Sequence, residues 1–285
     1  MIGQTRNKGG VSLGALVSGA LAAGAVIVAP TAQATCASFF GINNGGGCSS
    51  SQTSIAIAIG TGAQAFAGGL FGTSFAVGTD SISSIPSGGR NYFNLAAAVG
   101  VNALAEAGGA LSLAVAAGTN LTALAAETLH PYLPVANVAL NLGLSSTNNL
   151  TVADGVGNLA VNLFGNGTGQ DVRALGLANA AINIGGTGNA VRASVGTSQN
   201  AYASFAFNVL GSGNTVQAGG GPLAVAGAFN QTGATVTQAS PGINLFTRLA
   251  LAAAAQSHGP QAVKAASTPS ASKTVVPAAR DKRTT

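Results

Sequence analysis

Apolar and small residues alternate over short runs along most of this chain, and the runs recur. The clearest copies, at 137–142, 158–163 and 179–184, follow one another at intervals of 21 residues. Strict alternation over five or six residues is typical of a β-strand with one buried face. Repetition at a fixed period indicates a stack of similar units, each packing on its neighbours. The pattern therefore predicts an all-β chain folded as a parallel β-solenoid.

A column of alanines extends this pattern over most of the chain. Aligning the runs brings one alanine from each into register, with gaps of 18 to 25 residues between successive members. The longer gaps hold residues expected in loops, such as the Pro-containing segment 130–134. The column predicts about nine coils within residues 54–240. Its members are Ala56, Ala76, Ala96, Ala114, Ala139, Ala160, Ala181, Ala206 and Ala228.

The position two residues after each of these alanines changes along the chain. It holds Ala or Gly in the first four coils and Asn in the last five. Asn side chains stacked at the strand spacing of about 4.8 Å can hydrogen-bond along the stack. We therefore expect an asparagine ladder in the second half of the solenoid, made of Asn141, Asn162, Asn183, Asn208 and Asn230.

A second motif follows the alternating run. Its copies at 186–193 and 211–218 read Gly-x-Gly-Asn-x-Val-x-Ala. Gly and Asn permit a positive φ at a sharp turn, so each coil is expected to contain at least two strands. The glycines resemble a phosphate-binding loop. They recur at the repeat spacing, however, and no helix pattern follows them, which favours a structural turn over a cofactor site.

Alternation assigns the large and the small residues of each run to opposite faces of the strand. We expect the large column to point into the core, and the Ala and Asn columns to form a flat outer face. Such an exposed face predicts contact with a second copy of the chain or with a partner. The alternative is that Ala and Asn point inward as a narrow core. The large column comprises Ile57, Val77, Ala97, Val115, Leu140, Val161, Ile182, Phe207 and Phe229.

Residues 1–34 have the pattern of a secretory signal peptide. Two basic residues precede an apolar run at 11–28, and an Ala-x-Ala cleavage site ends at Ala34. We therefore expect a secreted or cell-surface protein without a transmembrane segment in its mature chain.

The mature chain is expected to have a cap at each end of the repeats. Cys36 and Cys48 are the only cysteines, and an even count in an exported chain predicts a disulfide, which would close an N-terminal cap over 35–53. Residues 241–258 are expected to form a helical C-terminal cap, because the run from Leu245 to Gln256 is Ala-rich and suits a short helix. Residues 259–285, rich in Pro, Ser, Thr and Lys, predict a disordered basic tail.

The charge lies mainly at the two ends. The net charge is +5, yet residues 35–263 contain four basic and five acidic residues. The repeats therefore carry no basic patch, and their sequence shows no aromatic interleaving. Both features argue against a nucleic-acid partner.

Residues that carry catalysis are scarce. Glu106 and Glu127 lie about one coil apart and form the candidate acid pair of a glycosidase or lyase, although solvated surface carboxylates are the stronger expectation. His130 and His258 have no Cys, Asp or Glu at ligand spacing. Only 6% of the residues are charged and Trp is absent. We expect no catalytic residue, no metal site and no cofactor.

Two resemblances follow from these motifs. The Ala/Gly/Asn-rich body, with Cys36 and Cys48 around Phe39-Phe40-Gly41-Ile42, resembles exported proteins of mycobacteria that have no assigned activity. The tracts at 54–60 and 74–78 are similar to the head repeats of trimeric autotransporter adhesins. That second resemblance implies a trimeric β-roll that binds host surfaces. The sequence shows neither the heptad stalk nor the C-terminal barrel strands of that family.

The sequence thus predicts an exported structural or adhesive surface protein that acts by shape and surface contact, without catalysis. Its expected partners are a second copy of the chain through the Ala/Asn face, and a cell-envelope polymer or a host surface. The alternatives are a carbohydrate-active β-helix enzyme and an envelope-glycan-binding module.

Overall fold

The computed structural model describes residues 35–88, 90–125, 134–143, 149–167, 169–194 and 202–247. These residues form strands and turns, and no helix occurs among them. The predicted all-β parallel solenoid is confirmed, and the predicted number of about nine coils is close to the observed stack.

The strands belong to two sheets. Sheet A has 12 strands, in the spatial order β2 (Ile42–Asn43), β1 (Thr35–Phe39), β4 (Ile55–Ile59), β6 (Thr73–Thr79), β8 (Leu95–Val101), β10 (Leu113–Thr119), β12 (Val138–Leu142), β14 (Leu159–Leu163), β16 (Ala180–Ile184), β18 (Phe205–Val209), β20 (Ala224–Phe229) and β22 (Gly242–Thr247). Sheet B has 10 strands, in the order β21 (Thr235–Gln238), β19 (Thr215–Ala218), β17 (Ala190–Ala193), β15 (Asp171–Leu177), β13 (Asn149–Val156), β11 (Leu121–Ala125), β9 (Leu104–Ala107), β7 (Ile82–Ile85), β5 (Gln64–Ala67) and β3 (Cys48–Ser50).

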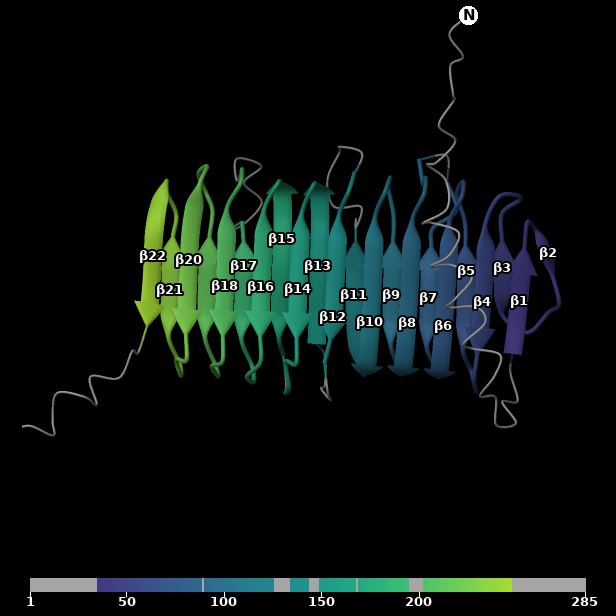
Figure 1. The fold of residues 1–285 in the computed structure, drawn as a ribbon, viewed down its shortest axis with the longest axis horizontal. Coiled ribbons are helices and arrows are strands. Elements are labelled where there is room, and N and C mark those ends of the chain that lie inside the picture. The colour runs from purple at the N-terminus through teal and green to yellow at the C-terminus, as the bar shows by residue number, and fades with distance from the viewer. Residues whose placement is uncertain are drawn as a thin grey trace, which may run out of the picture. The chain divides into compact units, whose positions relative to one another are not determined.

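Each coil contributes one strand to each sheet. The chain runs along β4 in sheet A, turns into β5 in sheet B and returns to sheet A as β6, beside β4 (Figure 1). From β4 onward, neighbouring strands of sheet A are parallel and pair residue for residue. Equivalent side chains of successive coils therefore stack in columns.

The core between the two sheets is narrow. Nearly every inward position of sheet A is Ala, Ser or Asn with 0% exposure, and sheet B contributes mainly Ala and Val. Small side chains let the sheets approach more closely than the usual spacing of about 10 Å. The Ser74 hydroxyl on β6 reaches across to donate to the carbonyl oxygen of Ser83 on β7, at 2.8 Å. A hydroxyl spans the gap, so no large side chain fits between the sheets at that level.

The prediction that the large apolar column fills the core is wrong, and the alternative arrangement is the observed one. Ala160 and Asn162 have 0% exposure, whereas Val161 between them points outward and is half-buried. The Ala/Asn face therefore lies inside the solenoid and cannot serve as the predicted contact face between copies. The physical reason is width: two facing sheets joined by short turns leave room mainly for small side chains on the sheet A side, and the larger buried residues, such as Leu121 and Val172, come from sheet B.

The predicted register is wrong in two coils. Ala56 pairs with Ser74, not with Ala76, and Ala206 pairs with Ala226, not with Ala228. Alanines two residues apart both point inward, so the sequence pattern alone fits either register.

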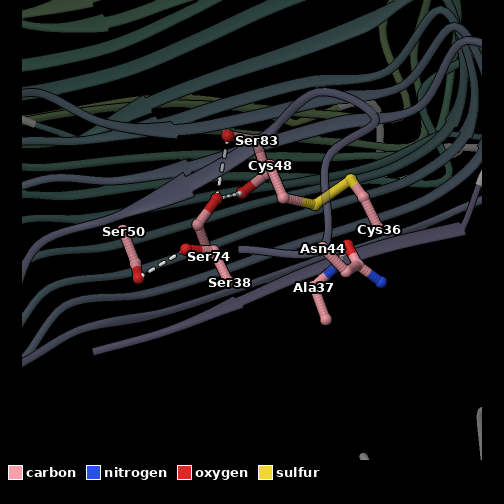
Figure 2. Close-up of a disulfide and its surroundings, with 8 residues drawn as sticks. All are labelled: Cys36, Ala37, Ser38, Asn44, Cys48, Ser50, Ser74 and Ser83. Carbon is pink, nitrogen blue, oxygen red and sulfur yellow. Dashed lines mark hydrogen bonds between the residues drawn. A yellow bond between two sulfur atoms is a disulfide. The ribbon is translucent and has the colours of Figure 1, made fainter. Parts of the chain in front are cut away.

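The N-terminal end is closed by a strand that runs against the others. β1 pairs antiparallel with β4 at the end of sheet A. Cys36 on β1 and Cys48 on β3 form a disulfide with a Cα–Cα distance of 5.6 Å, and it joins sheet A to sheet B at this end (Figure 2). The hydroxyls of Ser38 and Ser50 lie 2.8 Å apart and add a second link between the same strands.

The predicted helical cap at the other end is wrong where it can be compared. Residues of β22 (Gly242–Thr247) form a strand parallel to β20 instead of the start of a helix. The exposed edge of β20 offers backbone groups that an extended segment satisfies. The rest of the predicted cap, the basic tail and the predicted signal peptide lie outside the described residues.

Substitutions at two neighbouring residues test which face of sheet A is buried. Ala160→Leu should destabilise the fold by about 1–3 kcal/mol, because the larger side chain would force the sheets apart. Val161→Leu adds a methylene on the outer face and should change the unfolding free energy by less than about 0.5 kcal/mol. Urea unfolding followed by circular dichroism measures both. A stable Ala160→Leu beside a destabilised Val161→Leu would reverse the assignment of the faces.

Candidate functional site

An asparagine ladder runs along the inside of sheet A in the second half of the solenoid. The Nδ2 of Asn162 donates to Oδ1 of Asn141 at 2.9 Å, Asn183 donates to Asn162 at 2.7 Å, and Asn208 donates to Asn183 at 2.8 Å. All four side chains have 0% exposure. A chain of aligned amides in a dry interior is mutually polarising and structural, and it offers no surface for a ligand.

The ladder ends at Asn208, so its predicted fifth member is wrong. Asn208 pairs with Ala228, and Asn230 lies beyond β20, exposed, with a φ of +51°. Asn tolerates this left-handed conformation better than most residues, which explains its presence at the turn.

A second row of amides supports the ladder from the sheet B side. Asn183 donates to Oε1 of Gln170 at 2.8 Å, and Asn214 donates to Oδ1 of Asn208 at 3.0 Å. The equivalent positions of the first coils hold Ala63, Ser81, Ala103 and Leu121, which are all buried. The amides of this row therefore replace mainly apolar side chains at the turn into sheet B, in the half of the solenoid where the Asn column lies.

A third column was not identified as functional or structural from the sequence. Oδ1 of Asn137 accepts from the backbone N–H of Asn158 at 3.1 Å, and Oδ1 of Asn158 accepts from that of Asn179 at 2.9 Å. These side chains satisfy backbone groups at the turn into sheet A. The signal was present as the first Asn of each hexapeptide copy.

The outward face of sheet A is almost entirely apolar. From β4 to β22, three outward positions on each of ten strands form this apolar face, and Thr73 and Thr247 are its polar members. Most of its side chains are half-buried, while Leu95 is 40% and Phe229 47% exposed. The central column of the apolar face contains Ile57, Phe75, Ala97, Val115, Leu140, Val161, Ile182, Phe207, Gly227 and Leu245.

Exposed aromatic residues border the apolar face at one corner. Phe71 and Phe93 precede β6 and β8, stack with ring centroids 5.0 Å apart and are 55% and 58% exposed. Both have a positive φ, of 56° and 55°. Holding a non-glycine residue in this conformation costs on the order of 1 kcal/mol. Glycine at these positions would avoid that cost, so the rings occupy the corner at some expense in stability.

Charged residues gather on sheet B instead. Asp171 pairs with Nε of Arg173 at 2.6 Å and with Nη2 of Arg192 at 2.5 Å. The two guanidinium side chains are 41% and 38% exposed, so solvent screens these pairs and each contributes little to stability. The outward columns of sheet B mix these charges with Ser, Thr and Gln and with apolar neighbours such as Ile82 and Leu104. The solenoid therefore has one mixed, charged side and one uncharged apolar side.

The predicted candidates for catalysis are not brought together in the described residues. Glu106 points outward on β9, with Ser84 and Leu124 as its strand neighbours. Glu127, His130 and His258 lie outside the described residues. No group of three or more potential metal ligands occurs within the part of the chain that the structure describes.

A shallow groove of about 600 Å³ lies on sheet B near the N-terminal end. Phe66 lies within it, flanked on neighbouring strands by Ser49 and Ser84. The remaining lining includes Ser50, Ser51, Pro86 and Ser87. An aromatic ring among hydroxyl groups can pack on the C–H face of a sugar while the hydroxyls hydrogen-bond to it.

No protein-family model, curated protein or solved structure matches this chain. Within the described residues, no helix has the length and apolar character needed to cross a membrane. Function must therefore be argued from the surfaces themselves.

The same substitution at Asn183, inside the ladder, and at Asn230, outside it, tests which asparagines belong to the ladder. Asn183→Asp removes an amide donor and places a carboxylate in the core, so it should cost at least about 3 kcal/mol at pH 7. Burial would raise the pKa of the new carboxyl above its unfolded value, so its destabilising effect should diminish as the pH falls toward 4. Asn230→Asp, on the exposed turn, should be nearly neutral. Equal effects of the two substitutions, measured by urea unfolding at both pH values, would refute the four-member ladder.

Proposed function

We propose that the protein is an exported structural or adhesive surface protein that acts by contact, and that the apolar face of sheet A is its contact surface. The observation that carries this proposal is the absence of any charged residue from the 30 outward positions of that face, counted as three on each of ten strands.

The size of the face supports contact as the function. With strands about 4.8 Å apart and a rise of about 3.3 Å per residue, ten strands and five residues span about 700 Å². The largest apolar patch on a typical soluble monomer is about 300–600 Å², and larger ones mark interaction sites. Covering a face of this extent with another apolar surface releases the water from it and lowers the free energy.

Export is supported by two features. The Cys36–Cys48 disulfide forms and persists in oxidising compartments. The preceding segment has the charge and hydropathy pattern of a signal peptide.

A role without catalysis is supported by the distribution of charge. Asp171 is paired with two arginines, an arrangement that differs from the opposed acids that glycoside cleavage needs.

The groove around Phe66 favours a second candidate function, contact with an envelope glycan. Phe66→Ala should lower retention of the protein on an immobilised polysaccharide several-fold, because the ring would supply the packing surface. Phe75→Ala, the same substitution on sheet A, should leave retention unchanged. Loss of retention in both variants, or in neither, would remove the groove as a glycan site.

The main proposal is tested by adsorption at nanomolar protein concentration onto alkyl-coated beads. Leu140→Lys places a charge at the centre of the apolar face and should reduce adsorption at least about tenfold, since the ammonium group must be desolvated on contact. Leu104→Lys makes the same change on the outward face of sheet B and should adsorb as the unsubstituted chain does. Equal adsorption of all three proteins would show that another part of the chain makes the contact.

A further inference from the structure

We propose that the apolar face is the interface with a second copy of this chain, the two sheets A packing face to face as in a β-sandwich. The inference rests on the proposed function, because it takes the apolar face as the contact surface and names the partner. Four properties of the face favour a second copy.

The first property is area. The face of about 700 Å² per copy would give a pair burying about 1,400 Å², within the range of about 1,200–2,000 Å² typical of stable, specific interfaces. The whole length of sheet A from β4 to β22 is available to reach that area, because its strands are paired continuously.

The second property is the absence of charge. Every charge in a buried interface must be desolvated or paired, and an uncharged face meets a copy of itself without that cost. None of the 30 outward positions of sheet A is charged, whereas two copies of the sheet B face would bury Asp171, Arg173 and Arg192.

The third property is an even surface. The strands of sheet A stay in register, so their side chains form straight columns. The one glycine gap in the central column, Gly227, is covered by the ring of Phe207, whose Cζ lies 2.2 Å from where a Cβ would stand. Phe207 in turn stacks with Phe205 at 5.2 Å. Sheets with such faces pack about 10 Å apart with interdigitated side chains.

The fourth property concerns the main rival, a lipid surface. Apolar surfaces that bind bilayers normally combine the apolar side with Lys or Arg that attract anionic head groups. Among the described residues only Arg90, in the turn before β8, is an exposed arginine outside sheet B; Arg173 and Arg192 lie on sheet B, away from the apolar face, and both are paired with Asp171. The charge distribution therefore fits an apolar protein partner better than an anionic bilayer.

Sedimentation equilibrium of the full chain over nanomolar to micromolar concentrations tests the inference. We expect a reversible monomer–dimer equilibrium that persists or strengthens in 1 M NaCl, since apolar contact is not screened by salt. Leu140→Lys should raise the dimer dissociation constant about a hundredfold or more, because each pair would bury two uncompensated ammonium groups. Leu104→Lys should dimerise like the unsubstituted chain. Circular dichroism confirms that each variant is folded.

The outcomes separate this inference from the proposed function. A monomer at all concentrations that adsorbs to alkyl beads, or to neutral or anionic phospholipid vesicles, through Leu140 overturns the second copy but leaves the apolar face as the contact surface. A dimer unaffected by Leu140→Lys, together with unaffected adsorption, overturns both. A trimer would contradict two-fold pairing. If Leu140→Lys fails to fold, sedimentation of the unsubstituted chain still tests the inference, because a monomer at micromolar concentration contradicts it.

Discussion

The width of the space between the two sheets is the constraint on which the rest of the structure depends. Short turns join β4 to β5 and β5 to β6, and the two sheets come so close that the hydroxyl of Ser74 reaches the backbone of the facing strand. Sheet A fits only small side chains inside, and the larger partner of each of its alternating pairs is left outside. A core of alanines buries little area per residue, so regular backbone pairing and buried amide networks must supply much of the stability.

The same constraint produces the unusual surface. A solenoid with a wider core would hide its leucines, isoleucines and phenylalanines and present small polar residues to water. Here sheet A presents them outward with no charged residue among them, whereas the outward positions of sheet B mix apolar residues with serine, threonine and charged residues. The difference between the outer faces of sheets A and B therefore comes only from which residues occupy the outward positions. That choice is free of packing demands from within, so the apolar face is best explained by something that covers it from outside.

Much of the fold could be predicted from the sequence. Repeats such as 158–163 and 179–184 determine the strand, the period and the parallel stacking, because equivalent residues must align. The direction of the faces could not be predicted, because alternation separates two sets of residues without saying which is inside. The narrow space between the sheets decides which face of sheet A is buried, and it reverses the usual rule that large apolar residues are buried. The register of Ala76 was missed because either alanine of a pair two residues apart can align, and the end of the ladder at Asn208 because Asn230 fits the same spacing. The strand β22 was missed because the Ala-rich run that follows it favours a helix.

The apolar face of sheet A could not be predicted for the same reason, because alternation does not say which face is buried and the pattern favours placing its large residues in the core. Hydroxyl-radical footprinting with mass spectrometry tests the central claim most directly, because it measures side-chain exposure in solution. At low protein concentration we expect Phe75 and Phe207 to be oxidised as readily as Phe66. As the protein concentration rises, Phe75 and Phe207 should become protected while Phe66 stays reactive. Protection of Phe75 and Phe207 at every concentration, with reactive Phe66, would place them in the core and contradict the account.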